Sequence, residues 1–159
     1  MIDHFGAPWT APDRYEPRPD ARRFETWENN YAARLGLGVA IDYALEIGLG
    51  EIETRCQALA TQLRSALARI DGVTIHDLGP RPAAIVSFSL AGHDAGAVYR
   101  RLSEAGINVS TSRPASALLD FLARGLPTIV RASPHYYNTA EEIEALAATI
   151  RAMAGSRRA

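Results

Sequence analysis

The 159-residue sequence contains no lysine: all 17 of its basic residues are arginines. These residues alone therefore cannot carry out reactions that need a lysine amine, such as Schiff-base formation with an aldehyde. The single cysteine, Cys56, excludes an internal disulfide and a cysteine-based metal cluster. Metal-ligand spacings and glycine-rich phosphate motifs are also missing from the sequence, so we expect no metal site.

Long apolar runs and an excess of one charge are missing as well. No run reaches the ~20 residues of a membrane span, and the first residues lack the basic and apolar regions of a secretory signal. The net charge of −1 argues against attraction to nucleic acid or to an anionic membrane. We therefore expect a cytoplasmic protein that binds neither.

The composition is that of an ordinary globular protein, with 47% hydrophobic and 22% charged residues. Residues 1–25 are rich in proline, which lacks a backbone donor, so they are expected to form an extended arm or linker. One domain is expected over residues 26–154. The remaining residues, 155–159, are expected to form a frayed basic tail.

Apolar periodicity predicts two helices in the first half of the domain, over residues 28–47 and 52–70. The second helix has one apolar face, formed by Ile52, Cys56, Leu59, Leu63, Leu67 and Ile70. Because Cys56 lies on that face, we interpret it as a packed core thiol rather than a nucleophile.

Strand patterns and capping signals alternate in the second half. Strands are expected over residues 73–76, 83–90, 107–110 and 128–132. Asp94 is the expected N-cap of a helix whose inner face is Val98, Tyr99, Leu102 and Ala105. Thr139 and Glu142 have capping-box spacing before the last helix. This order of elements indicates an α+β fold, in which a small mixed or antiparallel sheet is covered on one face by helices.

The segment VRASPHYYNTAEEI, residues 130–143, places an arginine at the end of a strand and a turn before the last helix. An arginine fork grips a carboxylate through two hydrogen bonds. The segment resembles the corresponding part of class V aminotransferase-like enzymes, the pyridoxal phosphate (PLP) group that includes cysteine desulfurases. The resemblance implies that Arg131 binds the α-carboxylate of an amino-acid substrate. His135 is either a surface turn residue or a polar wall of the substrate pocket.

A second match is RFETWENNYAARLGLG, residues 23–38, where desulfurase-like relatives have RFExGTPN followed by a glycine-rich helix start. The threonine of those relatives reaches the cofactor phosphate of the partner subunit. Here Trp27 and Glu28 replace Gly-Thr, and a glutamate beside a phosphate is repulsive. By resemblance, Thr26 and Asn30 are the cofactor-binding candidates, although Thr26 fits a helix N-cap equally well.

The loop STSRPASALL, residues 110–119, corresponds to the segment that carries the mobile cysteine of desulfurases. Since this loop has no cysteine, an ordinary desulfurase mechanism is not expected. The resemblance instead favours a transaminase, a C–S lyase or an epimerase-type relative. Arg113 in the loop is either a solvated charge or a contact for a second acidic group on the substrate.

The resemblance covers nearly the whole chain and implies the small, substrate-side domain of a PLP enzyme, with the sequence beginning just beyond the PLP-lysine. We expect no catalytic residue, no covalent PLP and no turnover from these residues alone. The alternatives are a free-standing amino-acid-binding or dimerisation module, and half of a split enzyme completed by a separate lysine-bearing domain. A homo-oligomer is expected, and its candidate interface, or that of a partner, is the aromatic cluster Trp9, Tyr15, Phe24 and Trp27.

Overall fold

The computed structural model describes residues 6–25 and 28–156. Contacts divide the chain into two units, Met1–Glu46 and Ile47–Ala159. The predicted domain division at residue 25 stays a prediction. Among the described residues, no helix combines the length and the hydropathy needed to cross a membrane.

The first unit contains a hairpin that the sequence analysis did not anticipate. β1 (Trp9–Ala11) pairs antiparallel with β2 (Arg14–Tyr15). The rings of Trp9 and Tyr15 meet edge to face across it, with centroids 6.0 Å apart. A short 3-10 helix, η1 (Ala21–Phe24), follows Asp20, whose carboxylate accepts a hydrogen bond from the Arg22 N–H. Three of the four predicted interface aromatics (Trp9, Tyr15 and Phe24) are exposed, and Trp27 lies outside the described residues.

The long helix α1 (Tyr31–Ile47) completes the first unit. It begins later than residue 28, because the side-chain oxygen of Asn30 accepts from the Ala33 N–H at 2.9 Å and so caps the first turn. None of the α1 residues is buried. Gly48 follows with a φ of 96°, a left-handed conformation that ends α1 and precedes α2 (Leu49–Ala68).

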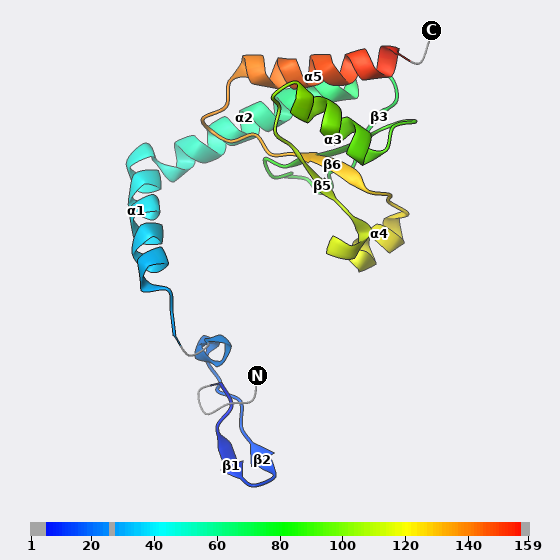
Figure 1. The fold of residues 1–159 in the computed structure, drawn as a ribbon. Coiled ribbons are helices and arrows are strands. Elements are labelled where there is room, and N and C mark those ends of the chain that lie inside the picture. Colours follow the sequence, from blue (N-terminus) through cyan, green and yellow to red (C-terminus); the bar gives the residue numbers. More distant parts are fainter. Residues whose placement is uncertain (1–5, 26–27, 157–159) are drawn as a thin grey trace. The chain divides into compact units, whose positions relative to one another are not determined.

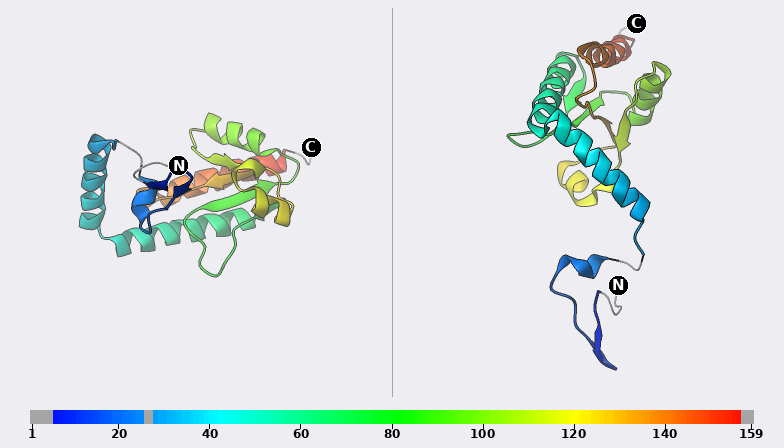
Figure 2. Two further views of the ribbon diagram at one scale, coloured as in Figure 1. Left: turned by 90° about the horizontal axis from the view of Figure 1, so that it is seen from below. Right: turned by 90° about the vertical axis from the view of Figure 1, so that its left-hand side faces the viewer.

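The second unit is built on a four-stranded antiparallel sheet with strand order β3-β4-β6-β5. The strands are β3 (Val73–Ile75), β4 (Val86–Leu90), β5 (Ser110–Ser112) and β6 (Ile129–Ala132). Helices α2, α3 (Ala95–Glu104) and α5 (Ala140–Gly155) lie on one side of the sheet, whereas α4 (Leu118–Arg124) lies on the other (Figures 1 and 2). The predicted α+β fold, an antiparallel sheet covered on one face by helices, is confirmed.

The core lies between the sheet and the three covering helices. Alternation in β4 turns Val86, Phe88 and Leu90 towards the helices and leaves Ser87 and Ser89 on the other face. Most of the predicted apolar stripe of α2 is buried, including Cys56, as expected for a packed thiol, whereas Ile52 is half-buried. The inward residues of α5 are Ile143, Leu146, Ala147 and Ile150, also as predicted.

The capping predictions hold, but some element boundaries do not. Asp94 caps α3, and Thr139 and Glu142 form the reciprocal capping box of α5. Strand β5 starts at residue 110 rather than 107, because the Ile107 N–H still bonds to the Leu102 carbonyl at the end of α3. Within α3 the inner face is formed by Ala95, Val98 and Leu102, whereas Tyr99 and Ala105 are exposed, contrary to the prediction.

Strand β4 is shorter than predicted because Arg64 of α2 uses the carbonyls of the preceding residues. Its Nη2 donates to the carbonyl oxygens of Ala83 and Ile85, and its Nε donates to Asp77 Oδ2 at 2.7 Å. Asp77 Oδ1 also accepts from the Ser87 N–H at 2.8 Å. The Arg64 and Asp77 side chains are only 17% and 9% exposed, so this ion pair ties α2 to the segment between β3 and β4.

We predict that Asp77→Ala lowers the free energy of unfolding by about 2 kcal/mol, since it leaves the Nε–H of half-buried Arg64 and the Ser87 N–H without their acceptor. Asp120→Ala is the matched control: its pair with Arg124 is more exposed, and it should cost no more than about 0.5 kcal/mol. Urea unfolding followed by circular dichroism measures both. Equal losses from the two variants would contradict the prediction.

Candidate functional site

The sheet face opposite α2, α3 and α5 carries a polar row across three strands. In the register of the sheet, Ser87 of β4 lies beside Arg131 of β6, which in turn lies beside Ser110 of β5. The two serines are half-buried, and Arg131 is exposed between them. Small hydroxyl side chains on both sides leave the guanidinium accessible from solvent.

Arg131 is restrained at one end only. Its Nε donates to Ser110 Oγ at 3.2 Å, which leaves the two terminal nitrogens for an outside acceptor. Within the described part of the chain, these terminal nitrogens have no carboxylate partner, unlike Nη1 of Arg124, which pairs with Asp120. A strand fixes the base of the side chain while its planar end stays free, which is an arrangement suited to binding a carboxylate.

Arg113 and His135 lie on opposite sides of Arg131 along the strand direction. Ser112 pairs with Ile129, so Arg113 follows β5 beyond the Ile129 end of β6, where it is exposed. His135 comes after the other end of β6. The register therefore brings Ser110 to Arg131 and places the other two candidates further along the sheet.

His135 belongs to an exposed aromatic turn. Its ring stacks on the ring of Tyr137, with centroids 5.2 Å apart, and lies edge to face with the ring of Tyr136, with centroids 4.7 Å apart. Its backbone N–H donates to Asn138 Oδ1 at 2.8 Å, a bond that closes the turn before α5. These contacts are those of a surface turn residue. A role for His135 in substrate binding stays a prediction.

The two cofactor-binding candidates lie in the first unit. Thr26 is outside the described residues. Asn30 uses its side-chain oxygen to cap α1, so that only its amide nitrogen remains available for a ligand. The proposed role of both residues in cofactor binding stays a prediction.

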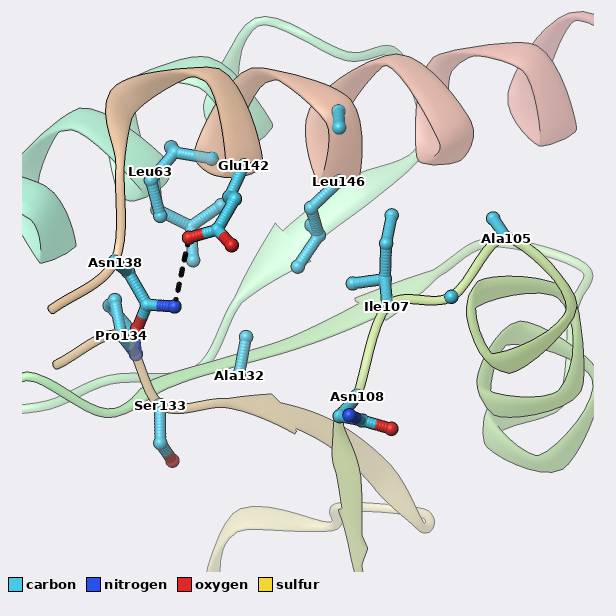
Figure 3. A pocket seen from close by; sticks show the side chains of 13 residues that line it. Leu63, Ala105, Ile107, Asn108, Ala132, Ser133, Pro134, Asn138, Glu142 and Leu146 are labelled. Carbon is cyan, nitrogen blue, oxygen red and sulfur yellow. Dashed lines mark hydrogen bonds between the residues drawn. The ribbon is translucent and has the colours of Figure 1, made fainter.

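A cleft of about 390 Å³ lies on the helical side of the sheet (Figure 3). Its apolar floor includes Leu63, Ile107 and Leu146, and its rim carries Asn138 and Glu142. The Glu142 carboxylate accepts from Asn138 Nδ2 at 3.0 Å and from the Thr139 N–H at 2.9 Å. The bonds from the Thr139 N–H and from Asn138 lower the pKa of Glu142. Both bonds end on Oε2, so this carboxylate serves the capping box at the start of α5.

The sheet face on the side of α4 also holds a histidine, His76, next to that helix. His76 Nε2 and Ser89 Oγ are 2.8 Å apart, and Arg124 of α4 donates to the His76 carbonyl. Burial, followed by the positive charge of Arg124, lowers the pKa of His76 below its ordinary value, whereas Asp77 acts in the opposite direction. The folded protein therefore favours the neutral imidazole.

A lowered histidine pKa makes the fold less stable in acid, because the unfolded chain then binds more protons than the folded one. We predict that the stability contributed by neutral His76 is fully present above the ordinary pKa of 6.5. This stability is lost as the pH falls from 6.5 through the lower pKa of the folded state. His76→Gln should flatten the decrease in urea midpoint between about pH 7.5 and about pH 5.5. Leu78→Gln, an exposed neighbour without a titrating group, should retain the wild-type slope. An unchanged slope in His76→Gln would refute the assignment.

Sequence reasoning missed Ser87 and Ser110 as neighbours of Arg131. The alternating pattern VSFSL in β4 does place its serines on one face, and this was the available signal. Which strand lies beside β6, and in which register, was not visible in the pattern. Ser110 was also assigned to the end of a strand that in fact begins there.

Comparisons with known proteins identify the family of the chain. The family model for class V aminotransferases matches residues 10–146. A cysteine desulfurase from Synechococcus elongatus is 38% identical over 138 residues, which cover 86% of this chain and 21% of that protein. The apo structure of the cysteine desulfurase from Thermococcus onnurineus NA1 is 28% identical, with a TM-score of 0.75 over 92% of this chain and 36% of its own.

A further solved structure has a similar fold. A lysine-to-alanine mutant of C-DES, with glycine covalently linked to its PLP cofactor, matches 90% of this chain and 35% of its own, with a TM-score of 0.66 and 22% identity. At that identity the likeness shows the fold alone. The chain spans about 21–34% of the length of the curated relatives it matches. Because the family model covers most of the sequence, the chain belongs to the class V aminotransferase family.

Proposed function

We propose that these residues form the substrate-side part of a PLP-dependent enzyme that acts on an amino acid, with Arg131 as the anchor of the substrate α-carboxylate. The observation that carries this proposal is the geometry of Arg131. Its Nε is held by Ser110, and its terminal nitrogens have no carboxylate partner among residues 6–25 and 28–156, on an exposed polar sheet face. A carboxylate held there by two parallel hydrogen bonds has a defined position and orientation.

The described residues do not fit PLP as a complete site. The sequence has no lysine to form the Schiff base. We therefore assign the cofactor to a lysine-bearing region outside these 159 residues, on the same polypeptide or on a separate one. PLP, when bound, acts as an electron sink for the amino acid. The part of these residues is to hold and orient the substrate.

The way in which Arg131 is held would determine the orientation of a bound substrate carboxylate. The strand β6 fixes its backbone, Ser110 restrains the guanidinium, and Ser87 occupies little volume on the other side. A bound carboxylate is then held at a fixed distance from the sheet, so that the rest of the substrate projects away from it. Such positioning lowers the entropic cost of reaching the reactive geometry.

The position of the only thiol bears on the reaction type. The matched curated relatives include cysteine desulfurases, and that chemistry needs an accessible thiolate. Cys56 is buried in the α2 stripe, and the loop of residues 110–119 has no cysteine. We therefore propose a transaminase, C–S lyase or epimerase-type reaction for the assembled enzyme, rather than desulfuration by an ordinary cysteine-dependent mechanism.

The test is to add PLP and a panel of amino acids to the purified chain and record visible absorbance and product formation. We expect neither bound-cofactor absorbance nor turnover above the background of free PLP and amino acid, because no lysine is present. Protein-dependent turnover would overturn the assignment. A defined amino-acid affinity without turnover would support substrate binding by this part alone, the behaviour of a free-standing binding module.

A further inference from the structure

A serine and a histidine are hydrogen-bonded to each other on the sheet face that also carries Arg131. His76 Nε2 and Ser89 Oγ are 2.8 Å apart, and both residues are half-buried. The sheet holds the two residues in place. Ser89 pairs with Thr74 in the ladder between β3 and β4, and the His76 N–H donates to the Ser87 carbonyl at 2.8 Å. The separation of the two side chains is that of a nucleophile and its general base.

The imidazole of His76 is in a state that accepts a proton. Burial, and then the positive charge of Arg124, lower the pKa of His76, whereas Asp77 acts in the opposite direction. When the neutral ring carries its proton on Nδ1, Nε2 accepts the hydrogen bond from Ser89 Oγ. The Asp77 carboxylate is bonded to other groups, so the pair is a dyad rather than a full triad within the described residues.

Ser89 also lines a cavity of about 440 Å³ at one end of the sheet, between the end of β4, the start of α3 and the start of β6. The apolar part of its wall includes Leu90, Val98 and Val130. His93 belongs to the same wall, and its Nε2 is buried without a hydrogen-bond partner among residues 6–25 and 28–156. A buried polar atom of this kind calls for an explanation. A ligand with a small apolar group and a polar oxygen matches both parts of the wall.

We propose that this cavity binds short-chain acyl esters and that Ser89 hydrolyses them through an acyl-serine, with His76 as the general base. Ser89 Oγ bonds to the acyl carbon as its proton moves to His76 Nε2. The alcohol part leaves with the electron pair of the broken C–O bond and takes the proton from His76. Water then attacks the acyl carbon, which releases the carboxylic acid and restores the serine.

An ester is the expected class of substrate, because an alkoxide leaves more readily than an amine and a dyad activates its serine less than a full triad does. The cavity volume and the apolar wall favour a short acyl chain. This hydrolysis uses no PLP, so it goes beyond the proposed function and does not depend on it.

Hydrolysis of p-nitrophenyl acetate by the full chain, without PLP, tests the proposal. The chain suits this assay, because it has no lysine amine that the reagent would acetylate. Acid quenching followed by peptide mass spectrometry should locate an acetyl group on Ser89. His76→Gln should slow the acetylation of Ser89 by about 100-fold or more, the contribution of a general base.

Three serine variants complete the test, each checked for folding by circular dichroism. Ser103→Ala changes an exposed serine of α3 and should retain the wild-type rate. Ser89→Ala should lose the acetylation, and Ser89→Cys should be acetylated on its sulfur, which keeps the test decisive if the alanine variant fails to fold. Equal rates for wild type and Ser89→Ala, an unmodified Ser89→Cys, or acetyl groups only on other residues would each reduce the pair to a structural contact between strands.

Discussion

Replacing Arg131 with glutamine is expected to weaken the binding of an amino-acid carboxylate by at least about tenfold, the equivalent of one charge-assisted hydrogen bond. The substitution keeps much of the side-chain length but removes the charge and the fork. Titration of the ¹⁵N-labelled chain with L-alanine, and with acetate as a carboxylate-only probe, gives the affinity. The Arg131 Nε–H signal and the Ser110 amide report on it directly, since these two side chains are hydrogen-bonded.

Two further variants distinguish a shaped site from simple charge. Arg131→Lys retains the positive charge and should bind more weakly than wild type, because an ammonium group cannot make the planar two-bond contact. Arg100→Gln removes an exposed arginine from α3 and should leave the affinity unchanged. If Arg131→Gln and Arg100→Gln lowered the affinity equally, the interaction would be non-specific and the assignment of Arg131 would fail.

Phe88→Ala is expected to lower the free energy of unfolding by about 3–5 kcal/mol, which is the largest effect that we predict on stability. Phe88 is fully buried at the centre of β4, and it lies in the cluster formed by the sheet with α2, α3 and α5. Its removal leaves a cavity that strands on both sides prevent from closing, because β4 pairs with both β3 and β6. Urea unfolding followed by amide circular dichroism provides the measurement.

Phe24→Ala is the control for the same chemical change at a surface. Phe24 is 74% exposed, and the Arg23 guanidinium lies 4.8 Å from its ring centre. Its loss should cost no more than about 0.5 kcal/mol. A cost below about 1 kcal/mol for Phe88→Ala would mean that the core lies elsewhere.

Features that depend on a few neighbouring residues could be predicted from the sequence. The buried stripe of α2, the Asp94 cap and the capping box at Thr139 all follow from local spacing, and each is present in the structure. The predicted strand boundaries were wrong where a group outside the strand forms a hydrogen bond with the backbone of the predicted strand. Arg64 holds the carbonyls ahead of β4, and the end of α3 holds the N–H of Ile107.

The surroundings of Arg131 could be predicted only in part. The motif located the residue at a strand end, but Ser110 and Ser87 became its neighbours through the strand order β3-β4-β6-β5, which no local pattern specifies. The exposure of α1 could not be predicted either. Its composition is that of a buried helix, and burial depends on what lies next to it rather than on the helix itself.

The residues of the buried core cluster all come after Gly48, whereas α1 lies before it. Mutations in these two regions should therefore have different consequences. Changes in the core should reduce the abundance of the chain whatever it assembles with. Changes in α1, none of whose residues is buried, should leave the stability of the core unchanged. The two regions are therefore expected to diverge under different constraints, because only one of them carries the core.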